Sequence, residues 1–67
     1  MINTEALKKR MREMGISQSE LADAIGVAAS TMCQKLNNIR PVTLNEAEQI
    51  SKKLLIADRD FGVYFFH

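Results

Sequence analysis

Two short stretches of this sequence carry the same helix-start signal, and they constrain the fold more than any other feature. Ser17-Gln-Ser-Glu20 and Thr43-Leu-Asn-Glu46 each place a hydroxyl residue three positions before a glutamate. This is the pattern of a capping box, in which the hydroxyl accepts a hydrogen bond from a first-turn amide and the glutamate reaches back to the cap residue. We therefore expect helices to begin near residues 18 and 44, so the chain is built from short helices.

A first helix over about residues 4–14 is predicted by apolar residues at helical spacing. Leu7, Met11 and Met14 recur along one face, opposite charged side chains. Gly15 follows directly and provides the left-handed conformation at which helices commonly end.

The second and third helices form a pair joined by a short turn. The second runs from the first capping box to Gly26, and the third covers about residues 29–37, with Ala28 or Ser30 near its start. The Arg40-Pro41 step prevents its continuation, because a residue before proline avoids helical angles.

A fourth helix follows the second capping box, and a last short segment closes the chain. The expected inner face of the fourth helix consists of Leu44, Ala47, Ile50, Ser51 and Leu54. Asp58 is expected to cap the last segment, from Arg59 to about Phe65. Because no segment alternates like a strand, the predicted fold is all-α, with five helices in a single domain over residues 1–67.

The composition excludes several classes of protein. The single cysteine, Cys33, allows no internal disulfide, and His67 is the only histidine, so no zinc-ligand spacing exists. The sequence shows no signal-peptide pattern and no apolar run of membrane-spanning length. It also offers no paired acid and base, no activated nucleophile and no phosphate loop. We expect a soluble, cytoplasmic protein that is not an enzyme and that needs no cofactor, metal or small-molecule ligand.

Charge is distributed unevenly, although the net charge is only +1. Residues 1–14 hold four basic and two acidic side chains, whereas residues 43–67 hold three basic and four acidic ones. The positive end is suited to face phosphates, and the alternative is an ordinary solvated helix face.

The helix pair over residues 18–37 carries the functional signal. Ala22 lies where two crossing helices approach closely, and Gly26 permits the positive φ of a sharp turn between them. The residues expected to face inward are Leu21, Ile25, Val27, Met32 and Leu36. The residues expected to face outward on the second helix of the pair are Ser30, Thr31, Cys33, Gln34 and Asn37.

Such an outward face suits the major groove of DNA, because its side chains reach base edges without excess bulk. Gln34 presents both a donor and an acceptor to adenine. Ser30 and Thr31 can contact bases or phosphate, and Ala28 or Ala29 can meet a thymine methyl group. Gln18, at the start of the preceding helix, is placed to contact a phosphate. A helical hairpin that merely packs is the alternative interpretation.

With the helices around it, this pair resembles the lambda-repressor-like family of helix-turn-helix proteins, the Cro and cI type, over roughly residues 4–56. The resemblance rests on Gln18, Leu21-Ala22, Gly26-Val27, Met32 and Leu36-Asn37. It implies a sequence-specific transcriptional regulator, a Cro-like repressor that reads double-stranded operator DNA with its third helix.

Carried over by position, the resemblance implies backbone contacts from Gln18 and from the Asn38-Ile39-Arg40 loop. It implies base contacts from Ala28, Ala29, Ser30, Cys33 and Gln34. The segment from Lys35 to Pro41, with the ending Tyr64-Phe65-Phe66, is similar to small phage or prophage repressor-like proteins.

Two positions and the composition of the outward face invite a separate interpretation. Lys35 occupies a place where many family members carry an aliphatic residue, so we expect its ammonium to reach out to phosphate while its stem covers the core. The outward face lacks arginine, which predicts a larger share of readout by DNA shape and water. Cys33 is either a redox switch or simply a small residue that fits the groove, and the second interpretation is favoured.

The aromatic ending is the last unusual feature. Three phenylalanines and one tyrosine lie among the final seven residues, more than a terminus normally exposes to water. They serve either as a core plug or as a homodimer contact through Tyr64 and Phe66, and two recognition helices one DNA turn apart would read a palindrome. The alternative function is a protein-binding helix-turn-helix module, of antirepressor or antitoxin type, that uses this aromatic segment.

Overall fold

The computed structural model describes residues 1–66, and over these residues the chain forms helices and no strand. The helices are α1 (Thr4–Met14), α2 (Gln18–Ile25), α3 (Ala29–Leu36), α4 (Leu44–Lys53) and α5 (Phe61–Phe65), with a 3-10 turn, η1 (Asp58–Asp60), before α5. The predicted all-α fold with five helices is therefore confirmed. His67, the single histidine of the sequence, lies outside the described residues.

Both capping boxes form as the sequence predicts. The Ser17 hydroxyl accepts a hydrogen bond from the Glu20 amide, and the Thr43 hydroxyl accepts one from the Glu46 amide. Each glutamate carboxylate in turn accepts a bond from the amide of its cap residue. These reciprocal bonds satisfy amides that the first turn of a helix otherwise leaves unpaired.

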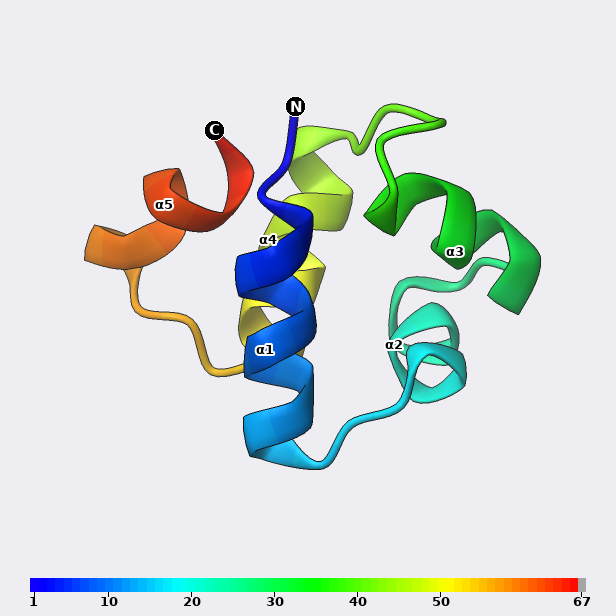
Figure 1. Ribbon diagram of the computed structural model, residues 1–67, viewed down its shortest axis with the longest axis horizontal. Helices are drawn as coiled ribbons and strands as arrows, with labels where there is room; N and C mark the ends of the chain where they lie inside the picture. Colours follow the sequence, from blue (N-terminus) through cyan, green and yellow to red (C-terminus); the bar gives the residue numbers. More distant parts are fainter. Residues whose placement is uncertain (67) are drawn as a thin grey trace.

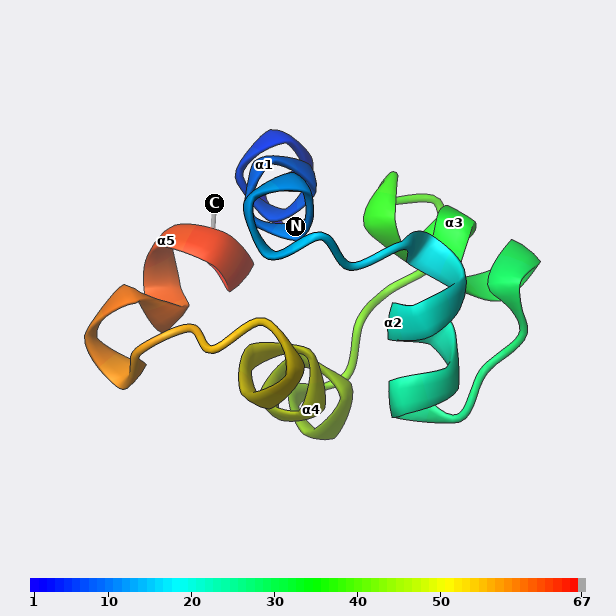
Figure 2. The same cartoon turned by 90° about the horizontal axis from the view of Figure 1, so that it is seen from below.

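The helices surround one apolar core. In Figures 1 and 2, α1 and α4 occupy the middle of the molecule, the α2–α3 pair lies on one side, and α5 lies on the other. The largest fully buried side chains come from the first four helices and from the residue that ends α4: Leu7, Leu21, Met32, Leu36, Ile50 and Leu54. Burying each of these contributes roughly 1.5–3 kcal/mol.

The two ends of the described chain lie together. The Asn3 amide donates to the Tyr64 carbonyl over 2.7 Å, and the buried Ile2 and Phe65 side chains belong to the core. Phe65 thus acts as a core plug, whereas Phe66 remains 72% exposed and Tyr64 is half-buried. The core-plug alternative therefore holds for Phe65, and the homodimer contact through Tyr64 and Phe66 stays a prediction.

Two expectations about the later helices are wrong. Leu44 is 63% exposed, because it is the first residue of α4 and the helix reaches the core only at Ala47; its side chain lines a surface hollow together with Phe66. Asp58 does not cap the last segment, since it lies inside the 3-10 turn that precedes α5, and Ala57 holds the cap position without a side-chain bond.

Candidate nucleic-acid interface

The turn between α2 and α3 has the geometry of a helix-turn-helix. Gly26 takes φ 76°, and the amides of Gly26 and Val27 donate back to the carbonyls of Asp23 and Ala22. Ala22 is 1% exposed, as expected for the close approach of two helices. A larger side chain at this position would push α3 away from α2.

Helix α3 has a buried face and an outward face of exposed and half-buried residues. Met32 and Leu36 are completely buried and anchor the helix to the core. The exposed residues at its start and along its length are Ala28, Ala29, Ser30 and Cys33, while Thr31 and Gln34 are half-buried. All six are small or polar, so α3 offers a narrow surface with hydrogen-bonding groups.

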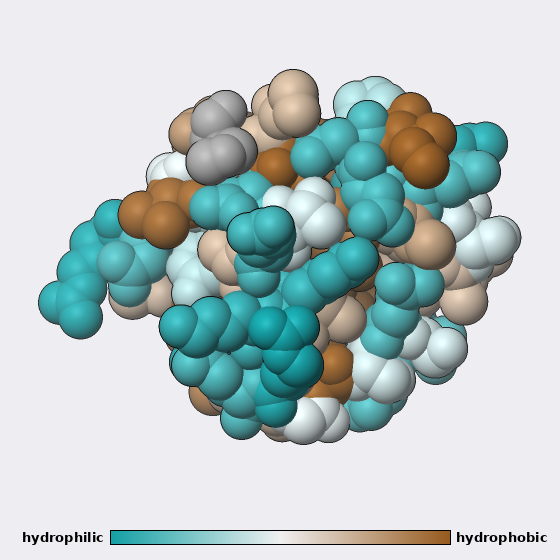
Figure 3. Space-filling model, in the orientation of Figure 1, coloured by the Kyte–Doolittle hydropathy of each residue, from teal (hydrophilic) through white to brown (hydrophobic). Residues whose placement is uncertain are grey.

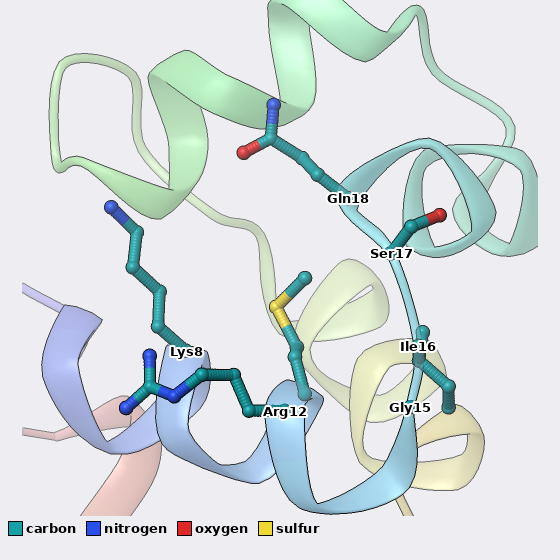
Figure 4. Close-up of a pocket in the computed structure, with 7 residues that line it drawn as sticks. Lys8, Arg12, Gly15, Ile16, Ser17 and Gln18 are labelled. Carbon is teal, nitrogen blue, oxygen red and sulfur yellow. The ribbon is translucent and has the colours of Figure 1, made fainter.

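A basic hollow adjoins the start of α2. Gln18, Lys8 and Arg12 line it, together with apolar Met11 and Ile16. Figure 4 shows the Lys8 and Gln18 side chains extending from α1 and α2 toward α3, with the Arg12 guanidinium beside Lys8. Figure 3 shows hydrophilic side chains gathered over α1 on the face in view. This surface can accept an anion such as a phosphate.

The basic residues of the N-terminal segment do not all serve this surface. Arg10 turns to the other side of α1, where its guanidinium donates to the Leu54 and Leu55 carbonyls at the end of α4. A count of the basic residues of this segment takes them together, so it does not single out Lys8 and Arg12 as the ones that line the hollow. Their separation by one helical turn, on the side of α1 nearest Gln18, is the signal that identifies them.

The loop from Asn37 to Thr43 connects α3 to α4 and carries several expected DNA contacts. Asn37 and Asn38 are held by the protein itself: the Asn37 oxygen accepts from Lys8, and Asn38 bonds to the Ile2 backbone and to the Thr4 hydroxyl. Asn38 takes φ 61°, a conformation that asparagine tolerates better than most residues. Arg40 is exposed.

The Lys35 ammonium does not lie where the sequence analysis placed it. It does not extend outward but donates to the Glu46 carboxylate over 2.9 Å and to the Pro41 carbonyl over 3.0 Å. Only 11% of the Lys35 side chain is exposed. The predicted outward reach to phosphate is wrong: the charge is neutralised inside the protein, because α4 presents an acid at this point.

The Glu46 carboxylate is held in its ionised form. Partial burial disfavours its charge, but hydrogen bonds from the Thr43 amide and the Lys35 ammonium outweigh that penalty, so its pKa lies below the ordinary 4.5. At neutral pH the pair therefore carries both charges.

Over residues 1–66 no group of histidine, cysteine or acidic side chains is arranged to hold a metal ion. None of the helices in that range has both the length and the apolar character needed to cross a bilayer.

A helical domain with this turn, a buried anchor face and an outward polar face on the second helix defines a helix-turn-helix DNA-binding protein. Residues 6–57 match the family model of the Cro/C1-type HTH DNA-binding domain, and the chain belongs to that family. DNA is therefore its partner, and the predicted lambda-repressor-like membership is confirmed. A search of curated proteins finds no match.

Proposed function

We propose that the protein is a sequence-specific transcriptional regulator, a Cro-like repressor that inserts α3 into the major groove of operator DNA. The division of α3 carries this proposal. Met32 and Leu36 are buried, while the outward face has no side chain large enough to hold the helix away from the groove. Proposed base contacts come from Ala28, Ala29, Ser30, Thr31, Cys33 and Gln34.

The sugar–phosphate backbone is proposed to be held at two places. Gln18, Lys8 and Arg12 form the first, since they line one hollow. The second is the loop after α3, with the exposed Arg40 and the backbone of Asn37 and Asn38. Contacts of this kind position a protein on the duplex without selecting a sequence.

Selection of bound DNA from a random duplex library, at physiological salt, tests this function. The expected result is enrichment of one motif, made of two related half-sites about one helical turn apart. Recovery of unselected sequence by a protein that circular dichroism shows to be folded would contradict operator reading. It would leave only general affinity for DNA.

A homodimer is proposed to deliver two copies of α3 to such a site. Four exposed apolar side chains, which we call the apolar edge, surround the adjoining hollows where the chain ends meet the start of α4: Met1, Ile39, Leu44 and Phe66. Exposed apolar side chains gathered in one place mark contact surfaces. Arg40 lines one of these hollows, so a second copy seated there would bring two proposed phosphate-binding loops close together.

The apolar edge also supports a second candidate, a protein-binding module of antirepressor or antitoxin type. A complex with another protein through these side chains would persist at high salt, whereas DNA binding weakens steeply. We favour the DNA-bound regulator because the matched family is a DNA-binding domain. The similarity of the segment from Lys35 to Pro41 and of the aromatic ending supports a regulator of phage or prophage type, which would act in the cytoplasm.

A further inference from the structure

The loop that carries Arg40 is fastened to the protein from both sides. On one side Asn38 bonds to the Ile2 backbone, and the Ile39 and Arg40 amides donate to the Gln34 carbonyl. On the other side the Lys35 ammonium bonds the Pro41 carbonyl. Figure 1 shows this loop as the extended connection from the end of α3 to the start of α4.

One carboxylate oxygen joins the second fastening to α4. Glu46 Oε1 accepts both from Lys35 Nζ, over 2.9 Å, and from the Thr43 amide, over 3.0 Å. The ammonium and the carboxylate are mostly shielded, with 11% and 16% of their side chains exposed. Shielding strengthens such a pair relative to a surface salt bridge and lets it hold a fixed geometry.

We propose that Lys35 and Glu46 are positioning residues for DNA binding: their ion pair sets the loop that presents Arg40 to the phosphate backbone, and neither residue contacts DNA. The inference rests on the proposed function of that loop. Without the pair, the loop loses its hydrogen bond at Pro41 and keeps only those of Asn38, Ile39 and Arg40, so part of its ordering must occur when DNA binds and costs affinity.

Glu46→Gln separates this role from a direct contact by the sign of its effect. Glutamine preserves a capping box, so the start of α4 is retained while the charge is lost. If Lys35 contacted phosphate, removing its acidic partner would release the ammonium and strengthen binding. The positioning role predicts the opposite, roughly fivefold weaker binding to the selected operator, within the range of coupling between contacting residues.

Glu48→Gln is the matched control, because Glu48 is an exposed acid on the same helix and is outside the ion pair. It should bind the operator no more weakly than the parent. Glu46→Gln binding as tightly as Glu48→Gln would overturn the proposal. Should Glu46→Gln fail to fold, the exchange measurement on Lys35→Met described next tests the proposal in its place, with Lys52→Met as the matched control that removes an exposed positive charge elsewhere.

Amide hydrogen exchange of the protein without DNA tests the loop directly. In Lys35→Met the Ile39 and Arg40 amides should exchange roughly fivefold faster than in the parent, while the Leu21 amide in α2 is unchanged. Equal loop exchange in the two proteins would overturn the proposal. Because this measurement uses no DNA, failure to find any operator would count against the proposed function alone.

Discussion

Gln34 has the longest uncommitted polar side chain on the outward face of α3, and its amide can bond adenine through a donor and an acceptor. We expect Gln34→Ala to cost about 1–3 kcal/mol on the selected operator and to relax the preference at one base pair. Binding isotherms on the operator and on its single-base variants measure both effects. Arg40→Ala is the control: it should weaken all DNA about equally and lower the slope of log affinity against log salt by roughly one. A variant of Gln34 that binds operator and random DNA as the parent does would place base recognition elsewhere.

Ser51, in contrast to the exposed polar residues of α3, carries a buried hydroxyl. Its hydroxyl lies in the inner face of α4 and has no hydrogen-bond partner within the described residues. Because a buried unpaired polar group costs free energy, Ser51→Ala should raise the free energy of unfolding by about 1 kcal/mol. Urea denaturation followed by circular dichroism measures this change. A loss of stability would mean that the hydroxyl finds a partner, such as a carbonyl of the preceding turn.

The pairing of α2 with α3 depends on a small residue at their closest approach. Ala22 is 1% exposed, so Ala22→Leu would overpack the contact and should lower the free energy of unfolding by roughly 1–3 kcal/mol. Ala24→Leu provides the comparison, because Ala24 is exposed on the same helix and should tolerate the change. Equal stability of the two variants would mean that the helices do not cross at Ala22.

Because Glu46 connects α3 to α4, the free energy of unfolding should depend on pH in the acidic range. The pKa of Glu46 is lowered in the folded protein, so its ionisation stabilises the fold above its unfolded value near 4.5. That contribution is lost as the pH falls through the lower, folded pKa. Melting temperatures of the parent and of Glu46→Gln between about pH 7 and pH 3 should therefore differ most near neutrality and converge in acid. The pKa of Glu20 is lowered as well, by the Ser17 backbone bond, and this group remains in both proteins. A constant difference across the range would show that the Glu46 charge does not contribute.

Sequence reasoning succeeds where the determining interactions are local. The starts of α2 and α4, the ends at Gly15 and Gly26 and the buried stripe of α3 all depend on residues within one or two turns of each other. The outward direction predicted for the Lys35 ammonium is wrong because its partner, Glu46, lies eleven positions away on another helix. The same holds for Arg10, whose acceptors at the end of α4 are more than forty positions distant. Such contacts become visible only when the helices have been assembled.

At the scale of the whole molecule, the proposed dimer depends on the apolar edge. Phe66 is 72% exposed there, so Phe66→Ser should shift the proposed dimer toward monomer and weaken binding to a two-half-site operator more than binding to a single half-site. Sedimentation equilibrium gives the first result and titration of the two duplexes the second. Leu55→Asn removes an equally exposed apolar side chain outside this edge and should change neither. A parent protein that remains monomeric on both duplexes would exclude the dimer.

The division of α3 has a consequence for how such a protein changes over generations. The residues that hold the helix in place, Met32 and Leu36, are different from those proposed to read bases. The outward positions contribute little to the core, so they can be exchanged at small cost in stability. A gene of this kind can therefore acquire a new target sequence without first acquiring a compensating change in the fold. Proposed base recognition and folding can therefore change independently, because different residues carry them.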